Sequence, residues 1–490
     1  MTEPQTLVVG SGAGGLTLAL LLAKAGRSVT LVEIQPTIGG YLRRFVRNGV
    51  FFDSGYHFSG GFENILRQMH RILGIDDLIS GMPISNRIIL KASQQCIDLP
   101  AGCGYAGALD EFSHHFPAEK AALSQLFDTV RSIWTNRQMG NLYDCSPMQL
   151  IISQYDSTTV REFCDRIGLS PAAETSAGSF AVCHGSPPAD VPMSFHARVG
   201  FSLYDSLARP VGGGDSIIHA FKREAAKFGI TIRTGSKLLR FSEPDSDGEC
   251  HLAFFSDGSS LPVDEVFFTI HPKSVQELLP ENIQSPQFRR RMLRLRETTS
   301  FFCVYYTVDD GIELPEGLLS FFSENDLDSI LRGTGGYSTG YLALRSPDVH
   351  GRMRSIITAF RTMPVMTPPI TLPHHARISD PDYQGFKARI SEEITWDLLE
   401  VYPHLKGHLH IEACGSPLTC LDYDPPTGSA YGVRCVCGQS RLCGALPVKN
   451  FYLAGQSASI PGVMGTMMTS FIVFRMAVGD EIYRRVIEGS

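Results

Sequence analysis

The chain opens with an apolar run that leads directly into a segment of helical character. Residues 6–10 read T-L-V-V-G and predict a short buried strand, and the mostly apolar residues 16–25 predict a helix that ends before Gly26. Residues 28–33, S-V-T-L-V-E, predict a second strand that ends in an acid. The order strand, helix, strand is typical of an α/β protein.

A glycine-rich turn joins the first strand to the helix, with the sequence Gly10-Ser11-Gly12-Ala13-Gly14-Gly15. Gly10 allows a tight turn, Gly12 lets the backbone approach a pyrophosphate, and Gly15 lets the helix pack close to the strand. The first amides of the helix would face the phosphates. Glu33 follows about 20 residues later, where its carboxylate can accept hydrogen bonds from a ribose 2′-OH. The spacing predicts a dinucleotide site.

Further strands and helices appear later in the chain. Behind a triple glycine at residues 212–214, which we interpret as a hinge between domains, a helical stretch runs to Phe228. Residues 230–241 and 264–270 then predict strands. Near the carboxyl end, a strand leads into Gly-Gln, and glycines open an apolar helix that continues to Met476.

Composition excludes several classes of protein. The 490 residues allow two or three domains, and the net charge of −7 argues against a nucleic-acid-binding protein. Hydrophobic residues make up 43% and charged residues 19%, which excludes a disordered chain. The cysteines contain one close pair, Cys435 and Cys437, which is not the pattern of a structural zinc site, so we expect no metal. The first residues lack the basic start of a secretory signal, so we expect reduced thiols and a cytoplasmic location.

The segment after Glu33 resembles a large flavoprotein group that includes amine oxidases and phytoene desaturases. A second glycine pair, Gly39-Gly40, comes soon after the acid, and a D-S-G turn follows at residues 53–55. Within that group, the run G-G-Y-L-R-R-F-V-R-N-G-V-F-F-D-S-G-Y-H-F-S-G-G resembles the carotenoid isomerase and retinol saturase branch. The resemblance implies an α/β fold, with a Rossmann-type FAD-binding domain and an inserted α+β substrate domain. It places residues 1–85, 204–274 and 441–490 in the FAD domain, and residues 86–203 and 275–440 in the substrate domain.

The same resemblance implies which residues hold FAD. Gly39 and Gly40 would close over the pyrophosphate, and the backbone of Leu238 would reach the adenine. Tyr41 stands where desaturases often carry Arg, so the pyrophosphate partner is open between Arg43 and Arg44. The remaining residues implied, at the ribityl chain and at the flavin, are Gly455, Gln456, Gly462, Val463 and Met464.

The implied chemistry is hydride exchange or isomerisation at carbon–carbon double bonds of an apolar polyene or isoprenoid. Reduction is the first expectation because the D-S-G-Y-H-F-S-G-G run resembles retinol saturase; redox-neutral isomerisation and desaturation are the alternatives. Two other classes share the fold, namely flavin amine oxidases and the non-catalytic Rab GDP-dissociation inhibitors. No sign of an amine oxidase is apparent in the sequence, and the intact glycine fingerprint argues against the inhibitors.

Tyr56 and His57 are the first candidates to supply the proton that net reduction needs, or to orient the flavin, because they directly follow the D-S-G turn. His57 has an equally plausible reading as a structural histidine. Tyr204, His184 and Tyr431 are weaker candidates. Only one dinucleotide fingerprint is visible, so electrons would come from transient NAD(P)H, from a donor protein or from a quinone, unless the reaction is redox-neutral.

Two segments have the pattern of helices that lie on a membrane surface, where an apolar substrate would partition. Residues 64–75 gather apolar side chains on one helical face, and residues 288–296 alternate five arginines with apolar residues. An ordinary amphipathic helix with a solvated basic face is the simpler explanation of the second segment. No run reaches the roughly 18 apolar residues of a spanning helix, so we expect peripheral contact at most.

Overall fold

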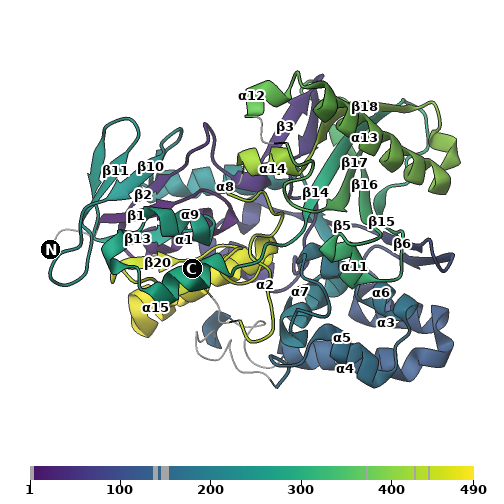
Figure 1. The fold of residues 1–490 in the computed structure, drawn as a ribbon, viewed down its shortest axis with the longest axis horizontal. Helices are drawn as coiled ribbons and strands as arrows, with labels where there is room; N and C mark the ends of the chain where they lie inside the picture. Colours follow the sequence, from purple (N-terminus) through teal and green to yellow (C-terminus); the bar gives the residue numbers. More distant parts are fainter. Residues whose placement is uncertain are drawn as a thin grey trace.

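A six-stranded sheet organises one half of the molecule (Figure 1). The computed structural model describes residues 5–135, 142–144, 154–370, 373–423, 426–439 and 442–489. The strands are parallel except for the edge strand β19, and their order is β19 (Gly444–Ala445), β20 (Phe451–Leu453), β13 (Glu265–Phe268), β1 (Gln5–Val9), β2 (Ser28–Val32) and β9 (Thr231–Arg233). Three distant parts of the chain thus contribute to one sheet, as a Rossmann-type domain assembled from separate segments requires.

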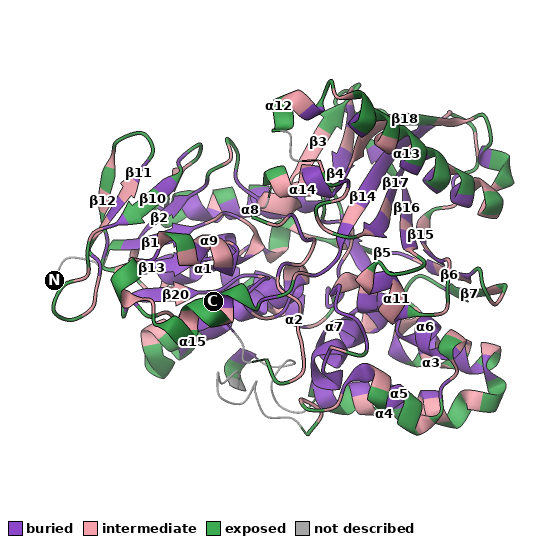
Figure 2. Cartoon of the chain, in the orientation of Figure 1, coloured by how far each residue is buried: buried purple, intermediate pink, exposed green. Residues whose placement is uncertain are grey.

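Two long apolar helices cover this sheet. Helix α1 (Ala13–Lys24) is buried from Gly14 to Ala23 and packs along α15 (Gly462–Glu488), where Ser470 Oγ donates to the Gly14 carbonyl at 3.1 Å. By length and composition α15 could cross a membrane, but 61% of its apolar window is buried inside the protein. Figure 2 shows α15 buried in its first part and more exposed toward its end. The apolar character of α15 is therefore accounted for by its position in the core.

A seven-stranded sheet organises the other half. Its order is β18 (Leu409–Gly415), β14 (Ser300–Val308), β17 (Met353–Met363), β16 (Ser338–Pro347), β15 (Gly317–Phe322), β6 (Asn86–Leu90) and β7 (Gln95–Leu99). All neighbours are antiparallel except β15 and β6. Helix α13 (Pro381–Val401) packs on one face of this sheet, and its buried Ile394 and Leu398 belong to the same apolar core as Phe302 and Tyr306 of β14.

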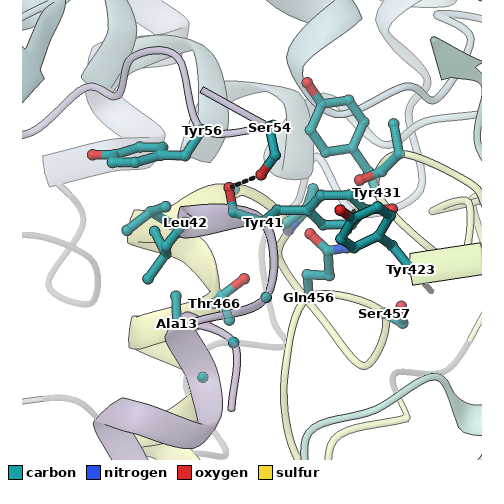
Figure 3. Close-up of a pocket in the computed structure, with 18 of the residues that line it drawn as sticks. Ala13, Tyr41, Leu42, Ser54, Tyr56, Tyr423, Tyr431, Gln456, Ser457 and Thr466 are labelled. Carbon is teal, nitrogen blue, oxygen red and sulfur yellow. Dashed lines mark hydrogen bonds between the residues drawn. The ribbon is translucent and has the colours of Figure 1, made fainter. Parts of the chain in front are cut away.

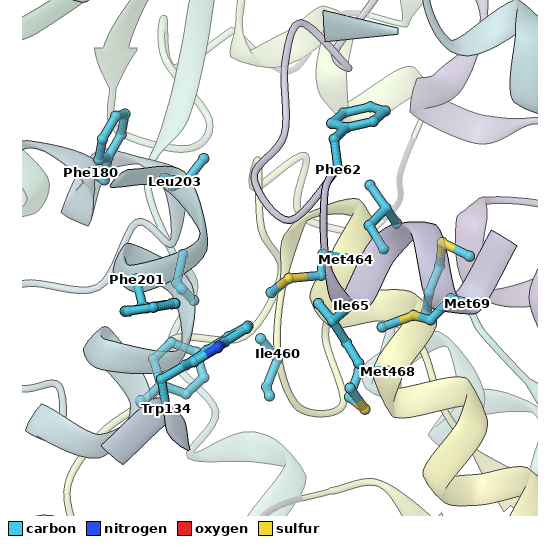
Figure 4. Close-up of a cluster of buried hydrophobic side chains, with 14 of the residues drawn as sticks. Phe62, Ile65, Met69, Trp134, Phe180, Phe201, Leu203, Ile460, Met464 and Met468 are labelled. Atoms are coloured by element: carbon cyan, nitrogen blue, oxygen red, sulfur yellow. The ribbon is translucent and has the colours of Figure 1, made fainter. Parts of the chain in front are cut away.

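A group of helices lies beside the second sheet, formed by α3 (Gly104–His115), α4 (Lys120–Thr135), α5 (Val160–Ile167), α6 (Pro171–Ala177) and α7 (Met193–Asp205). These helices meet the first half of the molecule in one continuous hydrophobic core. Figure 4 shows Trp134, Phe201 and Leu203 facing Ile65 of α2 (Ile65–Leu73) and Met464 of α15. The two halves are therefore joined by apolar packing.

Smaller elements complete the fold. The strands are β3 (Arg44–Arg47), β4 (Val50–Asp53), β5 (Gly81–Pro83), β8 (Ala208–Pro210), β10 (Leu238–Phe241), β11 (Leu252–Phe255) and β12 (Ser260–Pro262). The helices are α8 (Gly214–Lys227), α9 (Pro272–Leu278), α10 (Pro286–Leu293), α11 (Leu327–Arg332), α12 (His374–Arg377) and α14 (Pro417–Tyr423). Residues 230–241 form two strands in different sheets, β9 and β10, because the chain turns between them at Gly235, which has a φ of 61°.

The two expected domains correspond only in part to the two sheets. Residues from all three segments of the expected FAD domain supply strands of the six-stranded sheet. Residues 275–295, expected in the substrate domain, instead contribute Val275, Leu279 and Met292 to the core that also holds Leu7 of β1. The domain boundaries stay a prediction, with α9 and α10 lying beside the first sheet.

The structure changes the interpretation of the two candidate membrane helices. In α2 the apolar face is buried in the protein core, including Ile65, Leu66 and Met69, so the expectation that it meets a membrane is wrong. Helix α10 buries only Met292 and leaves Leu293 79% exposed beside its arginines. The apolar pattern of α2 is that of a core helix, because a lipid and a protein core select the same residues.

His70 of α2 makes the stability of this core dependent on pH. Burial lowers the pKa of His70 from 6.5 to about 4. Between these two pH values the imidazole is neutral in the folded protein, whereas in the unfolded chain it binds a proton. Stability contributed by neutral His70 is therefore present above pH 6.5 and is lost as pH falls toward 4. We expect His70→Leu to shrink the difference in unfolding free energy between pH 8 and pH 5 by about 2 kcal/mol, measured by urea unfolding. The same change at the exposed His114 should leave that difference unaltered.

Candidate active site

A cavity of about 770 Å³ runs from the first sheet to the second. The residues that follow β1, β2 and β13 line it at one end, which is the edge where parallel sheets bind ligands. Side chains of the seven-stranded sheet and of α7 line the other end, among them Leu203, Phe301, Leu318 and Phe360. The arrangement therefore joins a polar, glycine-lined end to an apolar end within one cavity.

The glycine turn has the geometry that its spacing predicts. Gly10 has a φ of 95°, and a Cβ on Gly15 would lie 1.8 Å from the Gly10 carbonyl oxygen, so both positions require glycine. A Cβ on Gly12 would meet nothing within 4 Å. Gly12, Ala13 and Gly14 line the cavity at the start of α1, where the first amides of the helix have no side-chain cap. This turn leaves open space at a helix N-terminus, as a pyrophosphate requires.

Glu33 and Ser11 lie at the same end of the cavity. Glu33 is 8% exposed, and its carboxylate accepts hydrogen bonds from the Ser11 backbone N–H at 3.0 Å and from the Gln35 N–H at 2.9 Å. Ser11 Oγ also donates to this carboxylate at 2.5 Å, while the Gly39 N–H donates to Ser11 Oγ at 3.1 Å. These bonds fix the acid beside the glycine turn, in the position expected for a ribose contact.

The second glycine pair packs against the first turn, and the structure distinguishes the two arginines that follow it. Gly40 lies so close to Gly12 that a Cβ on Gly40 would be 3.1 Å from the Gly12 Cα. Arg43 lines the cavity, and its Nη2 is buried and has no hydrogen-bond partner among the described residues. Arg44 instead forms an ion pair with Asp215 at 2.8 Å and does not line the cavity. The geometry therefore favours Arg43 as the partner of an anion.

A second helix N-terminus faces the same cavity. Gly462, Val463 and Met464 begin α15 and line the cavity, and a Cβ on Gly462 would meet nothing within 4 Å. Gln456 also lines it, and its Nε2 donates to the Ala430 carbonyl at 3.4 Å. Gly455 has a φ of 90° and packs against the backbone of Thr269, so it shapes the turn rather than the cavity wall. The amides at this helix start can stabilise negative charge on a ligand.

The remaining predicted cofactor residues divide into one that lines the cavity and two that pack behind its wall. Leu238 lines the cavity at the end near Glu33. Gly15 and Gly39 lie behind the wall, where a Cβ on Gly39 would be 2.3 Å from Ile218 of α8. The triple glycine also serves close packing, because a Cβ on Gly214 would be 2.1 Å from the Leu42 carbonyl oxygen.

A buried ion pair anchors the D-S-G turn. Arg209 Nη2 donates to both carboxylate oxygens of Asp53, at 2.8 and 2.7 Å, and both side chains are less than 10% exposed. Burial raises the pKa of Asp53, while the adjacent guanidinium opposes that rise. The pair ties the end of β4 to β8 and so holds the following residues, Tyr56 and His57, at the cavity wall.

Tyr56 and His57 both line the cavity in a buried environment. Burial lowers the pKa of His57 to about 3, helped by the charge of Arg209, and burial raises the pKa of Tyr56 well above its usual range. His57 stacks on Phe360 with a ring distance of 4.7 Å, and its buried Nδ1 has no hydrogen-bond partner among the described residues. At neutral pH both groups are uncharged and each carries one proton.

The other three candidates lie differently. The Tyr204 hydroxyl donates to the backbone carbonyls of Ala177 at 2.9 Å and Ser176 at 3.3 Å and does not line the cavity, so the structure gives it a packing role. His184 also lies outside the wall and pairs with His196 at 3.0 Å. Tyr431 does line the cavity, near Tyr41 and Tyr423 (Figure 3).

Several residues that line the cavity or hold its wall in place are not predictable from the sequence pattern. Tyr41 stands out in the sequence only as a departure from the family pattern, yet Gly55 packs on its ring, where a Cβ would lie 2.9 Å from Cδ1. Arg209 and Phe360 are not among the predicted site residues. The P-V-G-G-G motif directly after Arg209 is the one available signal for the former, and nothing in the sequence marks Phe360.

Comparison with known proteins gives a consistent result. Residues 8–73 match the family described as the NAD(P)-binding Rossmann-like domain. The human all-trans-retinol 13,14-reductase is 22% identical over 97% of this chain and 86% of its own length. The phytoene desaturase of Fusarium fujikuroi is 23% identical over 54% of this chain and 48% of its own length.

Solved structures share the fold at low identity. An oxidoreductase from Methanosarcina mazei has a TM-score of 0.63 and 14% identity, and covers 96% of this chain and 100% of its own. Cyclohexylamine oxidase from Brevibacterium oxydans has a TM-score of 0.59 and 15% identity, with 100% of this chain and 99% of its own covered. The chain is thus similar over nearly its whole length to the all-trans-retinol 13,14-reductases and over about half of its length to phytoene desaturases, and it has glycine turns around one cavity, as an oxidoreductase with a flavin-type cofactor requires.

Proposed function

We propose that this protein is an FAD-dependent oxidoreductase that reduces a carbon–carbon double bond of an apolar polyene. The observation that carries the proposal is that one continuous cavity joins the glycine turns to an apolar wall that includes Leu203, Phe301 and Leu318. The relatives that match nearly the whole chain are named for reduction of a retinoid double bond.

The residues at the polar end fit FAD. Open space at Gly12 and the start of α1 suit a pyrophosphate, and the Nη2 of Arg43, which has no partner among the described residues, suits its charge. Glu33 suits a ribose, since a 2′-phosphate would meet its negative charge. The start of α15, with Gln456, suits a ribityl chain and a flavin ring. When bound, the flavin supplies or accepts a hydride at its N5 atom.

The protein's own residues would then hold the substrate, exclude water and deliver one proton. The apolar wall excludes water from the double bond. Tyr56 and His57 are both neutral acids, and either can give a proton to the carbon that does not receive the hydride. Arg209 holds their loop in place through Asp53. For the reductant we propose transient NAD(P)H, a donor protein or a quinone.

Anaerobic incubation of the purified protein with several polyenes, with and without a reductant, tests the proposal. A yellow protein and a product heavier by two hydrogens are the expected results. A product lighter by two hydrogens would indicate desaturation, and an unchanged mass with altered retention would indicate isomerisation. Protein that stays colourless after incubation with FAD would favour a non-catalytic binding protein, and turnover of amines would favour an amine oxidase.

Replacing the two proton candidates tests their role. We expect Tyr56→Phe or His57→Phe to lower turnover about 100-fold or more while flavin stays bound, because proton delivery typically contributes at least that factor. Tyr204→Phe is the matched control, since its hydroxyl contacts backbone outside the cavity wall. Because the pKa of His57 is about 3, the rate profile should show no inflection from this residue between pH 5 and 8. Normal turnover of both variants would remove the role from both residues.

We also propose α10 as the part of the surface that contacts membranes. Leu293 is 79% exposed, and Arg289, Arg290 and Arg294 are exposed around it. A basic face with an exposed apolar residue supports binding to anionic lipid headgroups.

A further inference from the structure

The sheet wall of the cavity changes from apolar to polar along a single row. Cys303 of β14 pairs across the sheet with Phe360 of β17, Phe360 with Gly340 of β16, and Gly340 with Ser320 of β15. All four residues line the cavity. Ser320 therefore ends the row with a hydroxyl, next to a glycine that has no side chain to cover it.

Ser320 is bonded to a buried amide that has hydrogen-bonding capacity left over. Ser320 Oγ donates to Asn86 Oδ1 of β6 at 2.8 Å. Asn86 is 1% exposed, and its Nδ2 has no hydrogen-bond partner among the described residues. Leaving such a donor buried and unpaired costs about 1–3 kcal/mol, and buried polar groups of folded proteins are normally paired with protein, water or ligand. Of the two residues only Ser320 lines the cavity, so Ser320 is the member of the pair that a polar atom of a ligand can reach, and Asn86 supports it from behind.

The chemistry of the pair selects the class of ligand. With the amide as placed, the Ser320 proton is donated to Asn86, and the Ser320 oxygen can accept one hydrogen bond from a ligand. With the amide turned over, Nδ2 donates to Ser320, whose own proton can then be donated to a ligand. Ser320 therefore accepts from a ligand in the first arrangement and donates to it in the second, and the pair carries no charge. An alcohol has the same pair of functions, whereas a carboxylate only accepts and a hydrocarbon does neither.

The pair lies far enough from His57 for a long ligand to reach from one to the other along the sheet wall. The Phe360 ring covers Gly340, where a Cβ would be 2.1 Å from Cε2, and His57 stacks on the same ring. Ser320 lies two strands from Phe360, which at the usual strand spacing is about 10 Å. A long ligand bound through its end at Ser320 can therefore extend along the sheet wall toward His57.

We propose that Ser320 and Asn86 form a subsite for the terminal hydroxyl group of a polyene alcohol. This inference rests on the proposed function and adds to it the class of substrate end group. Ser320 would contact the hydroxyl, and Asn86 would position the Ser320 proton.

Equilibrium binding to the flavin-loaded protein tests the subsite, with all-trans-retinol, its methyl ether and the corresponding hydrocarbon as probes. We expect the alcohol to bind about tenfold more tightly than the hydrocarbon, with the methyl ether in between because it has lost the donor. Ser320→Ala should abolish this preference by weakening binding of the alcohol alone. Ser320→Thr, which keeps a hydroxyl, should retain it.

Ser202→Ala is the matched control, because Ser202 lines the same cavity but its hydroxyl donates to the Val199 carbonyl of its own helix. This variant should keep the preference for the alcohol. If Ser320→Ala weakens all three probes equally, or leaves the preference intact, the subsite is wrong although the protein still acts on polyenes. If none of the three binds to the unaltered protein, the proposed function fails with it.

Discussion

Gly12→Asp is expected to abolish retention of the flavin while the protein still folds. A Cβ at this position meets nothing within 4 Å, and the residue is the N-cap of α1 with an extended backbone, a position that aspartate favours. The new carboxylate would occupy the space proposed for the pyrophosphate and would repel its charge. We expect the dissociation constant for FAD to rise at least about 1,000-fold, which corresponds to about 4 kcal/mol. Flavin absorbance after desalting, with titration of the apoprotein, measures the change.

Gly385→Asp provides the comparison for that experiment. Gly385 is an exposed residue of α13, its added Cβ also meets nothing within 4 Å, and it does not line the cavity. The control protein should therefore bind FAD as the unaltered chain does. A yellow Gly12→Asp protein with unchanged affinity would show that the pyrophosphate does not lie at this turn.

The glycine-lined end of the cavity, where we propose the nucleotide, could be predicted as a structure because its determinants are local. The requirements at Gly10, Gly12 and Gly15 arise within one strand, one turn and one helix, and the structure shows a separate physical reason for each. Glu33 ends the next strand, so its place follows from the same unit. Arg43 and Arg44 are adjacent residues of the same type, so the sequence could not decide which of them faces the pyrophosphate. The structure distinguishes them because Arg44 forms an ion pair with Asp215.

The apolar end could not be predicted because its determinants are distant in sequence. Phe360 lies over Gly340 and against His57, and that contact exists only once β16, β17 and the D-S-G loop are assembled. Tyr204 shows the same limit, since its hydroxyl turns to the backbone of Ala177 rather than into the cavity. Helix α2 shows the same limit for a predicted membrane contact. An amphipathic pattern predicts an apolar face, but it does not distinguish a face covered by lipid from one covered by protein.

Arg209→Met is expected to destabilise the folded protein strongly. It leaves the Asp53 carboxylate buried without its partner, and removing one member of a buried ion pair typically costs about 3–5 kcal/mol of unfolding free energy. Arg87→Met, which breaks the exposed pair with Asp98, is the control and should cost less than about 1 kcal/mol. Urea unfolding at equal flavin occupancy measures both.

The pH dependence of the Arg209→Met protein distinguishes an unpaired charge from a simple loss of packing. Burial already raises the pKa of Asp53, and without the guanidinium that pKa rises further. A carboxyl whose folded pKa lies above its unfolded value gains stability as pH falls, because the folded protein binds the proton first. The loss caused by Arg209→Met should therefore be larger at pH 8 than at pH 5, and Asp53→Asn in the same chain should recover part of it. A loss of equal size at both pH values would mean that Arg209 acts through its packing, and that the D-S-G turn is held without its charge.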